Sequence, residues 1–184
     1  MSIAKGVTQD VQVDASLNDE QSSPSIAIAG FDATVDEARN RYQQARRLHW
    51  NQVARRLETW TGWGGYYHKR LTEVYQALIS PGQSVLELGC ARGDLLAAVK
   101  PSIGVGVDFS EEMIRAARRR HPHLRFVHGD AQTLKLSGKF DVIILSDLVN
   151  DVWDVQILLR NICQLATLAA ASSSMLTAVY GNRF

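Results

Sequence analysis

Apolar residues in the second half of the chain come in short runs, and most runs are followed by a segment with helical spacing. The runs are too short for helices and alternate little with polar residues, which predicts strands covered on both faces. They cover residues 84–88, 103–108, 124–128 and 140–145, with a candidate fifth at 175–180. The helical segments cover residues 94–100, 110–120 and 150–168. Strands that alternate with helices predict an α/β fold with a doubly wound parallel sheet.

The first 80 residues of the chain contain no comparable alternation of apolar runs with helical segments. Residues 1–32 are rich in Gln, Asp, Asn and Ser without a sustained period, and we expect a poorly ordered tail. Thr34 and Glu37 have the spacing of a capping box, which predicts a helix from Thr34 to about residue 59. Three glycines within residues 62–65 end it. A second helix is predicted over 66–79, before a Ser-Pro-Gly break.

Composition narrows the class of protein. The 184 residues are 46% hydrophobic and 21% charged, with a formal net charge of +1. This near-neutral balance argues against nucleic acid or an anionic membrane surface as a partner. Cys90 and Cys163 are far apart and lack metal-site or disulfide spacing. No signal peptide is recognisable, and no apolar run reaches the roughly 18 residues of a membrane helix, so we expect a soluble, cytoplasmic protein.

The predicted strand ends carry the residues with chemical potential. A parallel sheet binds ligands beyond the carboxyl ends of its strands. The first strand is followed by Gly89-Cys90-Ala91-Arg92-Gly93, where small residues let the backbone approach a ligand. Asp108 ends the second strand and could accept both hydroxyls of a ribose, while Phe109 could cover a purine. Asp130, after the third strand, could accept the exocyclic amine of an adenine.

These segments resemble motifs I to IV of class I S-adenosylmethionine-dependent methyltransferases in order and spacing. The matching segments are residues 85–95, 105–110, 128–131 and 140–147, and the resemblance extends over roughly 45–168. Tyr66-Tyr67-His68 and residues 146–156 are similar to a bacterial subgroup whose methyltransferase domain is often joined to a family 2 glycosyltransferase. The resemblance implies S-adenosyl-L-methionine as the cofactor and a Rossmann-like sheet.

The resemblance also implies roles for individual residues. Asp108 would hold the ribose hydroxyls, and Asp130 the amino group of adenine. Phe109 and Ala131 would contact the adenine ring, and Ser146 would lie near the methionine end. The methionine and ribose region would be contacted or shaped by Glu87, Gly89, Ala91 and Gly93.

The chain departs from the family pattern in two places. Ala91 replaces a glycine that many members carry, and we expect binding to survive this methyl group. The family sheet has seven strands, whereas this sequence ends where the fifth should finish. Either the chain is a fragment, or it leaves an unprotected sheet edge. The expected organisation is a tail over 1–32, helices over 33–80 that pack on or over the cofactor site, and a cofactor-binding core over 81–184 that is incomplete at its C-terminus.

The expected reaction is methyl transfer to an oxygen, nitrogen or carbon of a small-molecule, glycan-linked or lipid-carrier-linked acceptor, with glycosyltransferase association as an expected partnership. His68 and Asp147 are candidates for a general base. A nicotinamide oxidoreductase is disfavoured because Asp94 stands where that fingerprint requires glycine. A non-catalytic module that binds S-adenosylmethionine, or an inactive fragment, remains the alternative.

Other conspicuous residues have simpler interpretations. Cys90 is expected to be a packing residue, since no histidine lies near it in sequence. His121-Pro122-His123 is explained by a helix end, so no metal site is expected. Arg118 to Arg120 are expected to be a solvated helix terminus. Two interpretations remain open for the aromatic group Trp60, Trp63, Tyr66 and Tyr67. These residues either pack over the sheet or form a lid or a wall of the substrate site.

Overall fold

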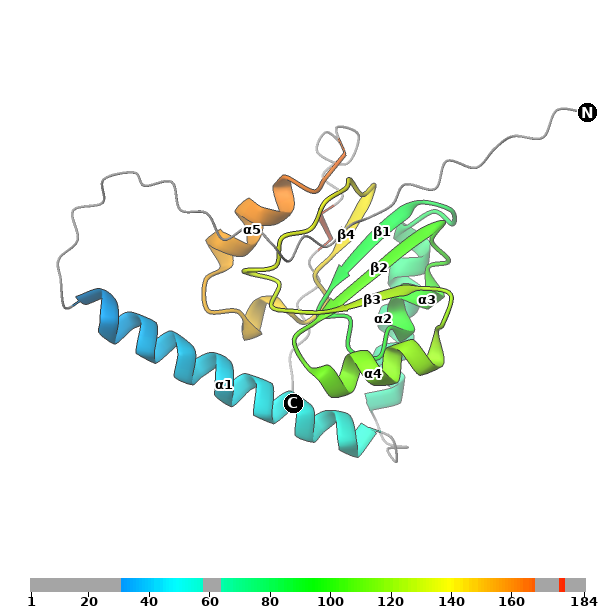
Figure 1. Ribbon diagram of the computed structural model, residues 1–184. Coiled ribbons are helices and arrows are strands. Elements are labelled where there is room, and N and C mark those ends of the chain that lie inside the picture. Colours follow the sequence, from blue (N-terminus) through cyan, green and yellow to red (C-terminus); the bar gives the residue numbers. More distant parts are fainter. Residues whose placement is uncertain (1–30, 58–63, 168–175, 178–184) are drawn as a thin grey trace, which may run out of the picture.

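The computed structural model describes residues 31–57, 64–167 and 176–177, and its centre is a parallel β-sheet (Figure 1). The strands lie in the order β3-β2-β1-β4-β5, and all neighbouring pairs are parallel. Their bounds are β1 Ser84–Leu88, β2 Ile103–Asp108, β3 Arg125–His128, β4 Val142–Ile144 and β5 Leu176–Thr177. Since β1 pairs with both β2 and β4, the strand order reverses beside β1, which is where such sheets bind ligands.

The helices cover both faces of the sheet and one of its ends. They are α1 Phe31–Leu57, α2 Gly64–Leu78, α3 Asp94–Ala98, α4 Glu111–Arg120 and α5 Val155–Cys163, with a short 3₁₀ helix η1 at Val149–Asp151. In Figure 1, α2, α3 and α4 lie on one face of the sheet and α5 on the other. The long α1 runs below the ends of the strands. The fold is therefore the doubly wound α/β arrangement that the sequence predicts.

Alternate residues of the central strands pack on opposite faces. Val85, Val142 and Ile144 belong to the core beneath α2, α3 and α4, where Tyr75 is fully buried. Leu86 and Ile143 belong to the second core, which Leu158 and Ile162 of α5 complete. Because both faces are apolar, the strands read as continuous hydrophobic runs in the sequence.

Several predicted boundaries are confirmed. β1 and β2 have the predicted bounds, whereas β3 and β4 lie within slightly longer predicted runs. Ser110 is the N-cap of α4, and its hydroxyl accepts the backbone N–H of Met113 at 3.3 Å. Glu111 and Glu112 occupy the first turn and Arg118 to Arg120 the last, where they complement the helix dipole.

The single helix predicted over 150–168 is wrong, since the segment divides in two. The 3₁₀ turn η1 ends at Asp151, and Val152 then adopts an extended conformation with ψ 147°. The helix α5 starts only after Asp154, whose carboxylate caps it by accepting the N–H of Ile157 at 2.9 Å. The Asp154 carboxylate accepts a backbone N–H that a backbone carbonyl would accept in a continuous helix. A new helix therefore starts at this residue, and the preceding turn does not continue through it.

The capping box predicted at Thr34 is also wrong. The helix α1 already begins at Phe31, so Thr34 lies inside it and cannot be its N-cap. No glycine or proline separates residue 31 from residue 34, and nothing in those residues stops the helix from extending backwards. Residues 31 and 32, which were predicted as the end of the tail, belong to α1, whereas residues 1–30, Trp60 and Trp63 lie outside the described residues. Among the helices of the described ranges, none is long and apolar enough to cross a bilayer.

Candidate functional site

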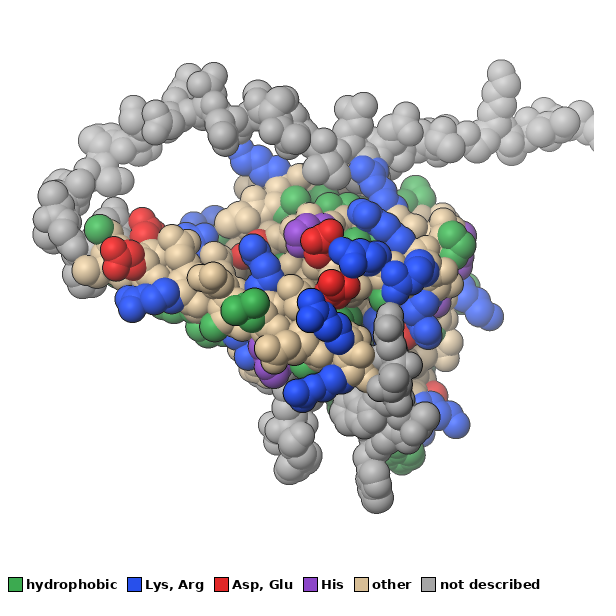
Figure 2. Space-filling model, turned by 60° about the horizontal axis from the view of Figure 1, so that its bottom comes forward, with side chains coloured by type: hydrophobic (Ala, Val, Ile, Leu, Met, Phe, Trp, Pro, Cys, Tyr) green, Lys and Arg blue, Asp and Glu red, His purple; other side chains and the backbone are tan. Residues whose placement is uncertain are grey.

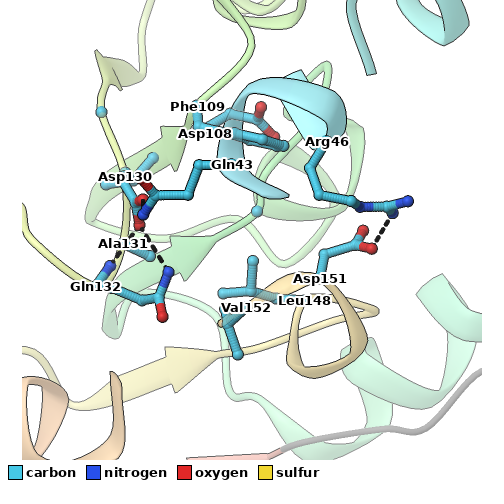
Figure 3. Close-up of a pocket in the computed structure, with 13 residues that line it drawn as sticks. Gln43, Arg46, Asp108, Phe109, Asp130, Ala131, Gln132, Leu148, Asp151 and Val152 are labelled. Carbon is cyan, nitrogen blue, oxygen red and sulfur yellow. Dashed lines mark hydrogen bonds and ion pairs between the residues drawn. The ribbon is translucent and has the colours of Figure 1, made fainter. Parts of the chain in front are cut away.

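A small cavity opens at the carboxyl ends of the strands, between the sheet and α1 (Figure 3). It is lined by residues that follow four strands: Gly89 after β1, Asp108 and Phe109 at the end of β2, residues 129–132 after β3, and Leu148, Asp151 and Val152 after β4. Gln43 and Arg46 of α1 close the remaining side. Of the nine predicted binding residues, five line this cavity: Gly89, Asp108, Phe109, Asp130 and Ala131.

Asp108 is held rigidly by the backbone around it. Its Oδ1 accepts the N–H of Ser110 at 2.8 Å, and its Oδ2 accepts the N–H of Ala91 at 2.9 Å. Burial raises the pKa of Asp108 to about 6, although these two N–H bonds act in the opposite direction. Each carboxylate oxygen retains a further lone pair. The geometry therefore presents two acceptors side by side, which suits the adjacent hydroxyls of a ribose.

Asp130 has one oxygen committed to its own loop and one directed to α1. Its Oδ1 accepts the backbone N–H of Gln132 at 2.8 Å. Its Oδ2 accepts the side-chain amide of Gln43 at 2.9 Å (Figure 3). The Gln132 carbonyl in turn accepts the Asn161 amide from α5 at 2.7 Å. The loop is thus fixed on one side, and the oxygen of Asp130 that can recognise a ligand is the one that Gln43 contacts.

The glycine loop places its three small residues in different surroundings. Gly89 has φ +76°, and a Cβ added there would lie 3.2 Å from the Leu148 side chain at the cavity. Ala91 adopts φ 46°, a left-handed conformation that costs an alanine about 1–2 kcal/mol. A Cβ on Gly93 would lie 2.5 Å from the ring of Phe126. Gly93 thus allows a helix to pack against the sheet, and only Gly89 of the three lines the cavity.

Glu87 lies next to the cavity but does not line it. Its side chain is buried, and burial raises its pKa well above the usual value. Its Oε2 is a buried oxygen without a hydrogen-bond partner. A buried acceptor without a partner costs about 1–3 kcal/mol, so it is suited to a polar group that reaches the site. This orphaned oxygen, with the paired acceptors of Asp108 and the amine acceptor of Asp130, fits an amino-acid-bearing adenosine.

The residues that α1 contributes were not predicted as site residues. Arg46 forms an ion pair with Asp151, whose second oxygen accepts the indole N–H of Trp50 at 2.9 Å. Gln43, Arg46 and Trp50 follow one another at spacings of three and four, which places them on one face of the helix. The sequence contained one signal for this contact, the regular spacing of these three residues. Docking faces are usually recognised by regularly spaced apolar residues, and this stripe is mainly polar.

A second group of polar residues lies at the end of β4. Asp147 has φ 55°, and both of its carboxylate oxygens accept the hydroxyl of Tyr67 from α2, at 3.1 and 3.2 Å. Tyr67 also meets the ring of His68 edge-on, with centroids 5.4 Å apart. Ser146 precedes Asp147 and does not line the cavity described above. The structure therefore brings one predicted base candidate, Asp147, together with a tyrosine of the aromatic group.

Other conspicuous residues lie away from this site. Cys90 is buried, and burial raises the pKa of its thiol well above the usual range, so it is a packing residue. His121 packs at the end of α4, with its Nε2 3.0 Å from Asp94 Oδ1. Arg118 to Arg120 are exposed at the end of α4, as expected of a solvated helix end, and Arg118 also donates to the backbone carbonyl of Phe126 at 2.8 Å.

Comparison with known sequences yields one family and several relatives. Residues 85–167 match the family described as "Methyltransferase domain". A probable S-adenosylmethionine-dependent methyltransferase of Mycolicibacterium smegmatis is 33% identical over 95 residues, which cover 48% of this chain and 37% of that protein. A phthiotriol/phenolphthiotriol dimycocerosates methyltransferase of Mycobacterium tuberculosis is 33% identical over 85 residues, covering 42% and 30%. The chain thus spans about a third of the length of these curated relatives.

Solved structures share the fold at low sequence identity. Magnesium protoporphyrin IX methyltransferase from Synechocystis, solved with bound S-adenosylhomocysteine, superposes with a TM-score of 0.56 at 20% identity, over 68% of each chain. The YcgJ protein of Bacillus subtilis gives a TM-score of 0.51 at 21% identity, over 54% of this chain and 47% of that one. These likenesses concern the arrangement of the sheet and its helices.

Proposed function

We propose that this chain, whose residues 85–167 form a methyltransferase domain of the class I S-adenosylmethionine-dependent type, transfers a methyl group to a small-molecule or carrier-linked acceptor. The observation that carries the proposal is the pair of acceptors at neighbouring strand ends. Asp108 offers both carboxylate oxygens at the end of β2 and Asp130 offers one after β3, and both line the cavity together with Phe109 and Ala131.

The residues around the cavity would each hold one part of S-adenosylmethionine. Asp108 would accept the ribose hydroxyls and Asp130 the adenine amine, with Phe109 and Ala131 against the ring. Gly89 has no side chain, so its backbone can lie close to the ligand. A Cβ there would also lie 3.2 Å from the side chain of Leu148. Glu87, with its unpaired oxygen, would receive polar groups of the methionine portion. The sulfonium of the bound cofactor supplies an electrophilic methyl group, so the protein mainly has to align an acceptor and exclude water.

We place the acceptor near the end of β4, where Asp147 and Tyr67 meet. An acceptor hydroxyl or amine must lose a proton when it gains a methyl group, and a carboxylate with an exposed approach can receive that proton. The Tyr67 hydroxyl, which donates to both oxygens of Asp147, would orient the carboxylate. His68 lies one residue further along α2 with its ring edge-on to Tyr67, so it is the second candidate for the same role.

The chemical class of the acceptor follows only from indirect support. The Mycobacterium tuberculosis relative is named for phthiotriol and phenolphthiotriol dimycocerosates. The near-neutral net charge of this chain gives no reason to expect nucleic acid. A glycan-linked or lipid-carrier-linked acceptor, and association with a glycosyltransferase, stay predictions of the sequence.

Titration calorimetry with S-adenosylhomocysteine tests the cofactor assignment. We expect binding by the full chain, and at least a tenfold loss in the Asp108→Ala variant, because two charge-assisted hydrogen bonds to ribose are removed. Lys135→Ala, on an exposed part of the chain away from the cavity, serves as a control. Equal affinity of Asp108→Ala and the unmodified chain would contradict the ribose assignment, and binding of NAD in preference would contradict the function.

Methyl-labelled S-adenosylmethionine tests the transfer itself. The chain is incubated with panels of phenols, amines, saccharides and glycolipid extracts, and label is followed into each. Transfer should fall strongly in Asp147→Asn while S-adenosylhomocysteine affinity stays unchanged. Cofactor binding with no transfer to any class would favour a binding module over an enzyme.

A further inference from the structure

The cavity is too small to hold a cofactor in the arrangement that the structure describes. Its volume is about 30 Å³, which is room for a couple of water molecules. Pockets for ligands of cofactor size are usually about 300–1,000 Å³. The walls contributed by the strand ends are fixed by backbone hydrogen bonds, so the volume is limited from the side of α1, by Gln43 and Arg46.

The contact of Gln43 has the chemistry of the expected ligand. Gln43 donates a side-chain N–H to Asp130 Oδ2 at 2.9 Å. An adenine amine would donate the same kind of N–H to the same carboxylate. Asp130 Oδ1 already accepts both the backbone N–H and the side-chain amide of Gln132, at 2.8 and 3.4 Å, so Oδ2 is the oxygen left for a ligand. Gln43 lines the cavity and contacts this oxygen, so its amide and an adenine amine would compete for the same place beside Oδ2 (Figure 3).

The helix α1 is held over the site by polar contacts, with little buried apolar surface. Its contacts include Gln43 with Asp130, Arg46 and Trp50 with Asp151, and Asn51 with Ser110 at 2.6 Å. Ala54 is its one buried hydrophobic residue among those described. Figure 2 shows the surface on the side of α1, where charged side chains of both signs surround only scattered hydrophobic ones. Elements with few buried apolar contacts open at the smallest cost.

From these observations we infer that Gln43 competes with the cofactor for its site: its amide occupies the place of the adenine amine on Asp130, and cofactor binding exchanges one for the other. The inference rests on the proposed function. It predicts that the unmodified chain binds an adenosine ligand less tightly than the strand-end residues alone would allow, because part of the population has Asp130 Oδ2 already bonded.

The exchange has a kinetic signature. Gln43 competes only before the ligand binds, so removing its amide should raise the association rate and leave the dissociation rate unchanged. We expect Gln43→Ala to bind S-adenosylhomocysteine about 3–10-fold more tightly, which corresponds to the loss of one hydrogen bond of ordinary strength. Stopped-flow fluorescence and titration calorimetry on the full chain measure the rates and the affinity.

The neighbouring Gln44 provides a matched control. It is the same residue type on the same helix but faces solvent. Gln44→Ala loses the same side-chain atoms and should bind S-adenosylhomocysteine like the unmodified chain. A gain in Gln43→Ala that Gln44→Ala does not share would belong to the Asp130 contact and not to altered helix propensity.

Each outcome decides the inference. Tighter binding by Gln43→Ala through faster association supports it, including the case where only that variant binds measurably. Weaker binding or faster dissociation would show that Gln43 is a ligand of the cofactor and overturn the exchange. Unchanged affinity would overturn it as well. If neither the unmodified chain nor any variant binds, the proposed function fails and the inference fails with it. If the unmodified chain and Gln43→Ala bind S-adenosylhomocysteine equally well, only the inference fails and the proposed function stands.

Discussion

At the scale of single residues, Asp108 has to be both buried and ionised when it accepts hydroxyl groups. Burial raises its pKa to about 6, whereas the usual value is 3.8. Ribose hydroxyls donate to the charged form, so a bound ligand stabilises the carboxylate and lowers this pKa. The contribution of Asp108 to folding stability depends on pH in the opposite direction to its contribution to ligand binding. The protonated form is favoured in the folded state, so the contribution of Asp108 to stability is fully present below pH 3.8 and is lost as the pH rises through 6.

Cofactor affinity should therefore depend on pH in a defined window. S-adenosylhomocysteine should bind with full affinity at pH 8 and about tenfold more weakly at pH 5, because the ligand must then compete with a proton on Asp108. Calorimetry across this range measures the dependence. Asp108→Asn cannot ionise and should bind weakly with a flat profile. A profile in the unmodified chain that stays flat from pH 5 to pH 8 would be inconsistent with this role.

Gly93 belongs to the glycine-rich loop that was predicted to bind the cofactor, but in the structure it packs against the ring of Phe126. Its φ is +74°, and a Cβ would lie 2.5 Å from Phe126 Cζ. We expect Gly93→Ala to lower the free energy of unfolding by about 2–4 kcal/mol, from backbone strain together with overpacking. Urea denaturation measures this change.

Gly82 separates the two causes. It has φ +86°, but nothing lies within 4 Å of an added Cβ. Gly82→Ala should therefore show the backbone strain alone, about 1–2 kcal/mol. If the two variants lose equal stability, the clash with Phe126 contributes nothing and the packing argument is wrong.

At the scale of elements, α1 differs from the helices of the core. The buried residues Met113, Ile114, Ala116 and Ala117 fix α4 against the sheet. By contrast, α1 relies on hydrogen bonds, the ion pair between Arg46 and Asp151, and the ring contact of Tyr42 with the partly exposed Trp153. Polar contacts near the surface contribute little net stability each. We therefore expect α1 to open without the sheet unfolding.

Amide hydrogen exchange tests this difference between elements. The central amides of α1 should exchange orders of magnitude faster than those of β1, because local opening costs less than global unfolding. α4 serves as the internal control, since it is a shorter helix that should nevertheless be better protected. Protection of α1 equal to that of β1 would show that the helix is an integral part of the core.

The elements also show where pattern-based prediction succeeds. β1 and β2 were predicted with their observed bounds because each is an apolar run between residues that break strands. The start of α4 at residue 110 was predicted because it is determined locally, by the Ser110 hydroxyl that accepts the N–H of Met113. The split between η1 and α5 was missed, since the apolar spacing continues across it and only the capping bond of Asp154 interrupts the helix.

At the scale of the whole molecule, the sequence by itself determined the fold class and the cofactor chemistry. Short apolar runs that alternate with helices require a parallel sheet, and parallel strands place their carboxyl ends at one edge. Gly89, Asp108 and Asp130 each follow a strand, so their convergence could be deduced without coordinates. Each of these signals is local, which is why the linear pattern contains it.

Only the tertiary structure showed which side chains lie opposite the binding residues at the strand ends. Nothing in the spacing of Gln43 or Arg46 indicates that they reach Asp130 and Asp151, 87 and 105 positions away. A helix that docks through polar side chains has no hydrophobic period, and hydrogen bonds between distant residues leave no trace in a single sequence. The pairing of Tyr67 with Asp147 was hidden for the same reason. The sequence therefore predicted the binding residues and a helical segment on or over the site, but not the side chains through which α1 contacts Asp130 and Asp151.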